Sequence, residues 1–241
     1  MNRGIYTTVS GMIGAQRWLD VVANNLANVS TVGFKRDALS FADTVERELR
    51  AAGGLGQSIG SIGAGADIDS QYTVMDEGPI ESTGRPLDMA VEGPKGMFAV
   101  QTPNGLRYTR DGAFTLNAQS QIVDRAGNPV LDNRSLPITL PTGGEPVVSA
   151  RGEIAVNGAS VATLGIFDGA FMKEGENLYS STNASAAEIA VRPRALEGSN
   201  VNAVASMIEM IQINRLYELA QRSVTQQDDL TQRLTQSLQN R

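Results

Sequence analysis

Apolar residues recur at helical spacing at both ends of the chain. Near the N-terminus they alternate steps of four and three, the spacing that keeps one seam of a helix facing a partner helix. The positions of this heptad are Ile5, Val9, Met12, Gln16, Leu19, Ala23 and Leu26. A second apolar pattern begins at Val201 and ends at Leu238, and no Pro or Gly follows Gly198. The pattern therefore predicts one long helix at each end of the chain.

The closing helix is longer than one small domain can cover. About forty residues at a rise of ~1.5 Å each span roughly 60 Å, about twice the diameter of a small domain. We expect its apolar stripe to need partners, which the N-terminal helix and neighbouring copies of the chain can provide. Residues 1–36 and 199–241 are thus predicted to form a coiled-coil-like axial domain.

Between the helices the hydrophobic pattern changes to period two. Short alternating runs occur at residues 87–91, 98–100, 106–108, 114–116, 138–140, 154–156 and 164–166. Turn-forming pairs such as Asn104-Gly105 and Asn157-Gly158 lie between them. Alternating runs joined by such turns are typical of β-hairpins. The chain is therefore expected to have an α+β fold, with a middle antiparallel β domain over residues 81–198.

The first helix and the β domain are joined by a segment rich in Gly and Ser, at residues 53–65. Such a composition stays extended or flexible unless another surface orders it. A phosphate-binding loop would need Gly-Lys-Ser or Gly-Lys-Thr at the start of a helix, and no Lys lies between Lys35 and Lys95. Residues 37–80 are therefore predicted to form an extended connector.

Composition excludes several classes of function. The chain contains 20 Lys and Arg and 26 Asp and Glu, which gives a net charge of −6. Nucleic-acid binding needs clustered basic residues, and the longest basic run is Lys35-Arg36. The chain has no His and no Cys, which excludes Ser-His-Asp and Cys-His catalysis and thiolate metal sites. We expect no nucleic acid among its partners.

Acidic patterns for metal binding are incomplete. Asp67, Asp69 and Asp76 resemble the start of a calcium loop, but Tyr72 and Gly78 occupy the positions of its Gly and its Glu. Pairs of acidic residues occur elsewhere, but no further catalytic group converges on them. We therefore expect no enzyme activity, no cofactor, no metal ion and no small-molecule substrate.

The segment after the first helix combines amide side chains with a glycine and an aromatic residue. Asn24, Asn25 and Asn28 lie at the predicted helix end, and Gly33 and Phe34 follow. Asn and Gly cap helix ends and tolerate left-handed backbone, and the aromatic ring can fix the chain to a core. Three Asn exceed what one cap needs, and side-chain amides both donate and accept hydrogen bonds. We expect this row to match backbone groups of a neighbouring subunit.

These residues resemble a known family signature. Residues 23–36 are similar to the N-terminal signature of flagellar basal-body rod and hook proteins, in which Asn-Asn-Leu-Ala-Asn is followed by Thr, Gly, Phe and a basic residue. Residues 196–204 resemble the run that starts the terminal helix of that family, and Ser199, Asn200 and Asn202 are N-cap residue types. Residues 82–93 and 108–114 resemble the beginning of its β domain.

The resemblance implies a structural subunit of the flagellar basal-body rod, which polymerises through its terminal helices into a hollow tube that transmits torque and passes exported subunits. Its partners would be copies of itself and other rod proteins. Within the family the chain looks most like a proximal-rod protein, with a distal-rod protein as the alternative. The residues expected at subunit interfaces are Ile5, Val9, Met12, Leu19, Asn24, Asn25, Leu26, Asn28, Gly33, Phe34, Ser199, Asn200, Val201, Asn202, Val204, Ile208, Ile211, Arg215 and Tyr217.

The resemblance also implies a place in the periplasmic rod and export without a cleaved signal peptide. The N-terminus lacks the apolar core of a signal peptide, and no apolar stretch reaches the eighteen residues typical of a membrane span. We expect no direct membrane insertion. A secreted β-domain binding module on a helical stalk is the alternative from another class. Apolar stripes at both ends favour the rod, because a stalk would carry heptads at one end only.

Overall fold

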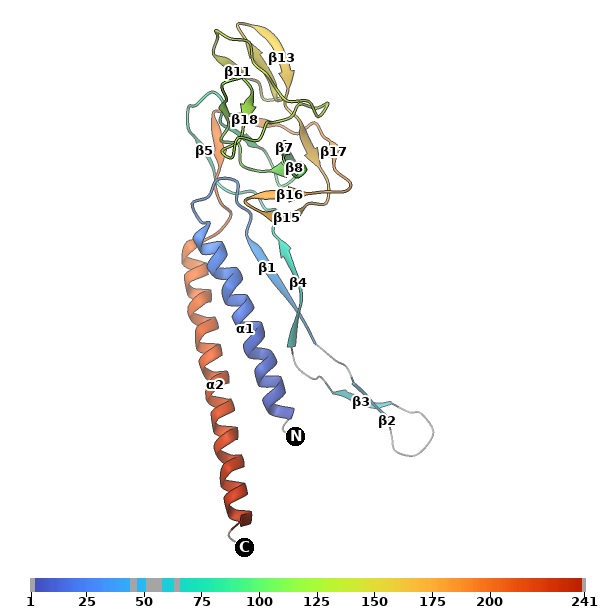
Figure 1. Cartoon of the computed structure of the whole chain (residues 1–241), viewed down its shortest axis with the longest axis vertical. Helices are drawn as coiled ribbons and strands as arrows, with labels where there is room; N and C mark the ends of the chain where they lie inside the picture. The colour runs from blue at the N-terminus through green and yellow to red at the C-terminus, as the bar shows by residue number, and fades with distance from the viewer. Residues whose placement is uncertain (1–2, 44–46, 51–57, 63–65, 240–241) are drawn as a thin grey trace. The chain divides into compact units, whose positions relative to one another are not determined.

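The computed structural model describes residues 3–43, 47–50, 58–62 and 66–239 (Figure 1). The chain divides into two compact units. The helical unit comprises Met1–Leu26, Asp37–Tyr72 and Asn202–Arg241, and the β unit comprises Ala27–Arg36 and Thr73–Val201. Helices and antiparallel strands are both present, so the predicted α+β fold is confirmed.

The helical unit contains the two terminal helices and four strands. Its elements are α1 (Arg3–Ala27), β1 (Asp37–Asp43), β2 (Arg47–Arg50), β3 (Ser58–Ile62), β4 (Ala66–Thr73) and α2 (Ala203–Gln239). Strand β1 pairs with β4, and β2 pairs with β3. These strands lie in the stretch predicted as an extended connector. Residues 53–57 and 63–65 of its Gly- and Ser-rich run lie outside the described residues, and residues 58–62 form β3.

The two helices lie side by side and pack along one face (Figure 1). Ala15, Val22 and Ile213 form the buried cluster between them, with 4%, 3% and 2% of their surface exposed. The partly buried residues around it are Trp18, Leu19, Met210 and Tyr217. The indole Nε1 of Trp18 donates a hydrogen bond to Oε1 of Glu209 at 2.8 Å. This contact between α1 and α2 is therefore small and mainly apolar.

The contacting face of α1 differs from the predicted heptad seam. Ala15, Trp18 and Val22 follow the spacing of three and four residues that puts side chains on one helix face. Among the heptad positions, Val9 and Ala23 are exposed instead. The apolar stripe of α1 is wider than one helix can cover, and the contact with α2 uses only one edge of it. The other edge, which includes Val9, remains uncovered within the chain.

The β unit contains fifteen named strands among the described residues. They are β5 (Ile80–Ser82), β6 (Met89–Val91), β7 (Met97–Thr102), β8 (Gly105–Thr109), β9 (Thr115–Leu116), β10 (Ile122–Val123), β11 (Pro146–Val148), β12 (Glu153–Val156), β13 (Ala159–Thr163), β14 (Ile166–Asp168), β15 (Met172–Gly175), β16 (Leu178–Ser180), β17 (Ser185–Ala186), β18 (Val191–Pro193) and β19 (Ala195–Glu197). The predicted runs fall in β6, β7, β8, β9, β12 and β14. The run at 138–140 forms only isolated bridges and backbone bonds to neighbouring loops.

The largest sheet has six strands in the order β15-β16-β8-β7-β14-β17. A separate sheet has the order β11-β12-β13, and Asn157 and Gly158 turn the chain between β12 and β13 with φ angles of 53° and 81°. Positive φ at both central positions is typical of the two-residue hairpin turn that the Asn-Gly pair predicts. Strands from the two ends of the unit also meet, because β18 pairs with β6 and β19 pairs with β5.

The core of the β unit is closely packed. Phe98 and Phe114 are nearly unexposed and meet edge to face, with ring centroids 5.1 Å apart. A second cluster surrounds Tyr179 and Met97. Gly112 lies so close to the carbonyl oxygen of Met89 that a Cβ would be 1.6 Å from it. The β unit thus buries most of its large apolar residues within itself, while a few such as Leu136, Val147 and Met172 are exposed.

Among the described residues, no helix combines the length and the hydropathy needed to cross a membrane.

Candidate functional site

A buried cluster of three charged side chains joins distant parts of the β unit. Strand β19 carries Glu197, whose carboxylate is unexposed. Its Oε1 accepts hydrogen bonds from Nζ of Lys35 at 2.5 Å and from the backbone N–H of Gly78 at 2.8 Å. Its Oε2 accepts one from Nη1 of Arg110 at 3.2 Å. We call Lys35, Arg110 and Glu197 the junction cluster.

Backbone carbonyls satisfy the remaining donors of the two bases. Nζ of Lys35 donates to the carbonyl of Asp76 at 2.7 Å. The guanidinium of Arg110 donates to the carbonyl oxygens of Val91, Gly93 and Lys95. Burial lowers the pKa of Lys35, and the Glu197 carboxylate opposes that shift. Removing one member of such a buried ion pair typically costs about 3–5 kcal/mol, because the partner charge is left without compensation.

The segment after α1 reaches the junction cluster through Gly33 and Phe34. The N–H of Gly33 donates to the Glu197 carbonyl at 2.7 Å, and its φ is +66°. A Cβ at this position would lie 2.4 Å from the carbonyl carbon of Arg110, so only glycine fits without a shift. The buried ring of Phe34 lies 3.9 Å from Nζ of Lys173, within the range of a cation–π contact.

The amide of Asn200 completes this arrangement. Its Nδ2 donates to the carbonyl oxygens of Val74 and Asp76, and its Oδ1 accepts the N–H of Arg36 at 2.7 Å. In the helical unit, Asn25 makes a similar pair of bonds with the N–H and carbonyl of Asp37, at 2.9 and 2.8 Å. The backbone groups that Asn25 and Asn200 bond belong to their own chain, and a role of these residues at a subunit interface stays a prediction.

Other predicted interface residues have structural roles within the chain. The hydroxyl of Ser199 accepts the N–H of Val201, and both residues are buried. Asn202 caps the start of α2, where its Oδ1 accepts the N–H of Ala205 at 3.0 Å. Oδ1 of Asn28 accepts the Thr31 hydroxyl. The Asn and Ser residues of both signatures therefore order the two chain segments that flank the helices.

The remaining predicted interface residues lie on the helices. Those that are exposed are Val9, Asn24, Val204, Ile208, Ile211 and Arg215. Those that are partly buried are Met12, Leu19, Leu26 and Tyr217. Ile5 lies in α1, and its side chain lies outside the described residues. The predicted set thus separates into residues that hold the chain together and residues that its own fold leaves uncovered.

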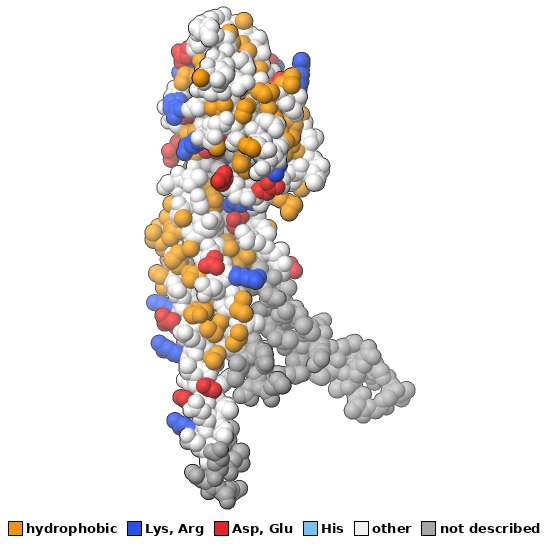
Figure 2. All heavy atoms as spheres, in the orientation of Figure 1, with side chains coloured by type: hydrophobic (Ala, Val, Ile, Leu, Met, Phe, Trp, Pro, Cys, Tyr) orange, Lys and Arg blue, Asp and Glu red, His pale blue; other side chains and the backbone are white. Residues whose placement is uncertain are grey.

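Helix α2 carries a second apolar face opposite the one that contacts α1. Val204, Ile208 and Ile211 are 67%, 52% and 53% exposed, and Met207 is 52% exposed. Successive helix residues are rotated by about 100°, which places these four side chains away from Ile213 and its contact with α1. We call them the outer ridge. Figure 2 shows hydrophobic side chains gathered over the helices, away from the C-terminal end of α2.

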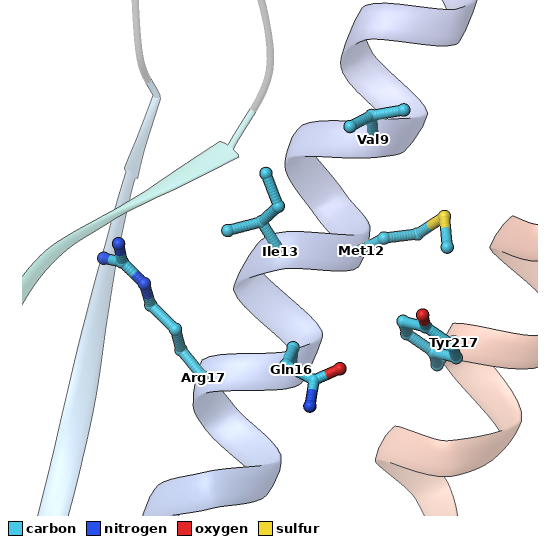
Figure 3. A pocket seen from close by; sticks show the side chains of 6 residues that line it. All are labelled: Val9, Met12, Ile13, Gln16, Arg17 and Tyr217. Carbon is cyan, nitrogen blue, oxygen red and sulfur yellow. The ribbon is translucent and has the colours of Figure 1, made fainter.

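The uncovered edge of α1 borders a pocket of about 380 Å³. Its lining residues are Val9, Met12, Ile13, Gln16, Arg17 and Tyr217, which we call the α1 pocket. Met12 points toward Tyr217 of α2, whereas Ile13 points away from α2 (Figure 3). Ile13 is 54% exposed. The helical unit therefore presents two separate apolar surfaces, the outer ridge and the α1 pocket.

Several of these residues were missed by the sequence analysis. Ile13 falls outside the heptad, and Met207 precedes the interface residue Ile208. Lys35, Arg110 and Glu197 lie within or beside the family signatures, but no local spacing shows that they meet. Within the part of the chain that the structure describes, no three or more Asp and Glu residues are grouped so that they could hold a metal ion.

Comparisons with known proteins agree with this arrangement. Residues 5–35 match the model of the flagella basal body rod protein family, and residues 192–237 match that of the flagellar basal body rod FlgEFG protein C-terminal region. Residues 90–158 match the flagellar hook protein FlgE/F/G D1 domain. The chain is 33% identical over 246 residues to the flagellar basal-body rod protein FlgF of Caulobacter vibrioides, with 98% of this chain and 96% of the relative covered. The chain belongs to the flagellar basal-body rod protein family.

The similarity extends equally to another rod protein of the family. The flagellar basal-body rod protein FlgG of Bacillus subtilis is 33% identical over 261 residues, which cover 97% of this chain and 98% of the relative. FlgG of Caulobacter vibrioides is 31% identical over 259 residues, which cover 97% of this chain and 98% of the relative. Rod proteins of this family are structural parts of the flagellar basal body, and this chain is accordingly a structural rod subunit. Membership of the family replaces the alternative of a secreted binding module.

Proposed function

We propose that this rod subunit, which has no catalytic activity, polymerises through its terminal helices with copies of itself and with other rod proteins. The product is the hollow proximal rod, which transmits torque and passes exported subunits. The observation that carries this proposal is the outer ridge of α2, an apolar face that the chain itself leaves uncovered. Residues 1–36 and 199–241 serve as the axial domain and residues 81–198 as the β domain, although residues 27–36 and 199–201 belong to the compact β unit.

The outer ridge supplies the free energy of a subunit contact. Covering the exposed half of one Val, Ile or Met side chain contributes about 1 kcal/mol. Four such residues contribute roughly 4 kcal/mol per subunit, a weak contact for two molecules but a useful one in a polymer in which each subunit repeats it. An exposed apolar face of this kind lowers the solubility of the monomer and does not stabilise its fold, which is typical of an interaction surface.

The α1 pocket is the surface that receives the outer ridge of a neighbouring copy. The two surfaces are different in residues and in shape, since one is a ridge and the other is concave. A contact between unlike surfaces is heterologous, and repeating it produces rings or open helical filaments instead of closed dimers. A tube built from one repeated subunit contact requires this type of interface.

The absence of cysteine allows a direct test of this contact. We expect rods that contain the double variant Ile13→Cys/Ile208→Cys to form disulfide-linked ladders under mild oxidation, because the two positions come from different copies. Neither single variant should cross-link, since equal positions do not meet in a heterologous contact. The double variant Ile13→Cys/Ala205→Cys is the matched control, because Ala205 is exposed on α2 at the same level as the ridge but on another side of the helix.

Two outcomes would contradict this arrangement. Dimers formed by Ile208→Cys alone would mean that ridge meets ridge. A double variant that assembles into rods without cross-linking would mean that other surfaces carry the contact.

The proximal position rests on the alignments. Similar fractions of this chain align over 246 positions with FlgF of Caulobacter vibrioides and over 259 with FlgG of the same organism, so the alignment with FlgG needs more gaps opposite this chain. A chain of FlgF-like length supports the proximal position, and a distal position is the alternative. Immunogold labelling of a tag inserted in the exposed turn at Asn157-Gly158 should mark the cell-proximal part of isolated rods. Label at the distal part would contradict the proposal.

The C-terminal part of α2 suits the wall of an export channel. Gln226, Gln232 and Gln236 are exposed, and the hydroxyls of Thr225 and Thr235 donate to carbonyls of their own helix. The same face carries the exposed Asp229 and Arg233, whose opposite charges cancel. A polar wall without net charge neither attracts a charged chain nor offers an apolar patch to an unfolded one. A density map of the rod tests this, since the Gln226 to Gln236 face should line the lumen and not an outer layer of protein.

Export without a cleaved signal peptide completes the proposal. The subunit reaches the periplasmic rod with its N-terminal helix intact, because that helix carries part of the assembly surface. The intact mass of the subunit from purified basal bodies should include all residues from the N-terminal heptad onward. A mass that shows loss of the first turns of α1 would contradict it.

A further inference from the structure

We propose that residues 191–201 close the β unit, so that the unit gains stable structure only when this last segment joins it. The benefit to a subunit that is exported as an unfolded chain rests on the proposed function, but the order of folding does not. Glu197 bonds to Lys35, Gly78 and Arg110 at sequence separations of 162, 119 and 87 residues.

The first segment of the β unit, residues 27–36, forms hydrogen bonds with its last segment, residues 191–201. Each residue from Gly33 to Arg36 bonds either Glu197 or Asn200. Gly33 donates to the Glu197 carbonyl, the Phe34 carbonyl accepts the N–H of Asn200, and Arg36 donates to the Asn200 amide. Residues 27–36 also contact Asp76 and Lys173, but the bonds of residues 33–36 to Glu197 and Asn200 form only when residues 197–200 are present.

The last segment also completes two pairs of strands and one turn. Residues Val191–Pro193 of β18 pair with Met89–Val91 of β6, and Ala195–Glu197 of β19 pair with Ile80–Ser82 of β5. The carbonyl of Arg194 accepts the N–H groups of Thr83 and Gly84. Without this segment, β5 and β6 would lose the partner strands that they have in the folded unit.

The buried charges make the folded state of the unit depend on the last segment more strongly than strand pairing alone does. Lys35 and Arg110 are 0% and 1% exposed, and they share the carboxylate of Glu197. Without that carboxylate, the unit would bury two neighbouring positive charges with no negative partner, and their repulsion would destabilise the folded state. Glu77 also acts on both bases electrostatically, but Glu197 has the stronger effect on each of them. A partly completed unit is therefore penalised until Glu197 arrives.

The segment that closes the β unit lies late in the chain, which affects when the unit can fold during export. Residues 191–201 are the last part of the β unit along the chain, and helix α2 comes after them. In a chain that emerges N-terminus first, the β unit would remain unfolded until residues 191–201 have emerged. This property would keep a subunit in the state required for passage through a narrow channel.

Pulse-labelling hydrogen exchange during refolding of the full chain tests the proposal. We expect amides of β7 and β8 to gain protection in the same kinetic phase as those of β18 and β19. Protection of β7 and β8 in an earlier phase would overturn it, because the sheet would then form before the closing segment joins. This measurement uses the unmodified monomer, so its result does not depend on whether the chain builds rods.

A variant of the junction cluster gives a second test. Glu197→Gln should slow refolding at least about tenfold while changing the unfolding rate less than about threefold, because contacts formed in the transition state affect mainly the folding rate. The matched control is Glu174→Gln, which removes an exposed ion pair with Arg107 and should leave the refolding rate within about twofold. Normal refolding with faster unfolding of Glu197→Gln would mean that Glu197 binds after the unit has formed, and would overturn the proposal. If Glu197→Gln does not refold, the labelling experiment on the unmodified chain decides.

Discussion

In the β unit the chain buries most of its large apolar residues in two clusters, with exposed exceptions such as Leu136 and Met172, whereas in the helical unit it buries few of them. Phe98, Ile122 and Ile154 are unexposed in the β unit. In the helical unit, Ile208 and Leu219 are 52% and 62% exposed, and its buried cluster consists of three residues. The difference indicates that the β unit is complete in a single chain, while the helices depend on neighbours for most of their burial.

The two units also place their charges differently. The β unit buries an ion cluster that fixes its two ends, while the outer ridge of α2 has no charge between Val204 and Ile208. Buried charge demands fixed partners, and an uncharged apolar ridge accepts any surface of matching shape. This division suits a subunit that must keep one part fixed and supply another part for assembly.

The largest expected effect comes from removing the shared carboxylate of the junction cluster. Glu197→Ala leaves the buried cations Lys35 and Arg110 without their common partner, which we expect to lower the free energy of unfolding of the β unit by about 3–5 kcal/mol. Urea unfolding followed by the β-type circular dichroism of the chain measures this change. The exposed control Glu174→Ala should change it by less than about 1 kcal/mol. Equal effects of the two variants would contradict the role of the cluster.

Two isoleucines of α2 separate folding from assembly. Ile213→Asp places a charge in the small α1–α2 cluster, so we expect the helices to separate, at a cost of about 3 kcal/mol. Ile208→Asp changes an exposed position and should alter monomer stability by no more than about 0.5 kcal/mol. Its charge would nevertheless be buried in a subunit contact and should abolish rod formation. Normal swimming of cells that carry Ile208→Asp would mean that the outer ridge does not face a neighbour.

The smallest effect concerns Asp111 in the β unit. Burial raises the pKa of this carboxyl above its ordinary value of 3.8, although the N–H of Ala113 and the Arg125 guanidinium oppose the shift. Between the two pKa values the folded state binds more protons than the unfolded state, so this group lowers stability as pH rises through that window. Asp111→Asn removes the contribution. The stability of the variant relative to the parent chain should increase from about pH 3 to about pH 6, and a decrease over that interval would contradict the assigned cause.

Sequence patterns predicted the elements well where local chemistry decides them. The Asn157-Gly158 turn and the alternating runs of β7 and β12 follow from residue type and spacing alone. The order of the strands did not follow, because strand partners such as β16 and β8 are distant in sequence. For short runs such as 138–140, the sequence does not distinguish a strand from an isolated β-bridge, because both have the same alternating apolar pattern.

The candidate site was predicted in part. The exposed Val204, Ile208 and Ile211 came from the helical stripe, but the same stripe did not reveal which edge of α1 would contact Ile213. Helix periodicity identifies apolar faces without identifying their partners. The bonds between the Asn25 amide and Asp37 of the same chain were not predicted, because local sequence does not show which backbone groups a side-chain amide meets.

The contact between Lys35 and Glu197 lay beyond sequence patterns for a similar reason. It joins residues separated by 162 positions, and only the folded β unit brings them together. Charged residues in a signature are ordinarily interpreted as surface groups, because such side chains are rarely fully buried without a partner. The partner here is visible only in three dimensions.

Hydrogen exchange of the free subunit and of assembled rods tests the central claim most directly. Amides of β7 and β8 should be strongly protected in both states, because the β unit is complete within one chain. Amides of α2 beyond its contact with α1, from Leu219 to Leu230, should exchange rapidly in the monomer and become strongly protected in the rod. Strong protection of α2 in the monomer, with no gain on assembly, would show that the helical unit is already complete and would contradict the account.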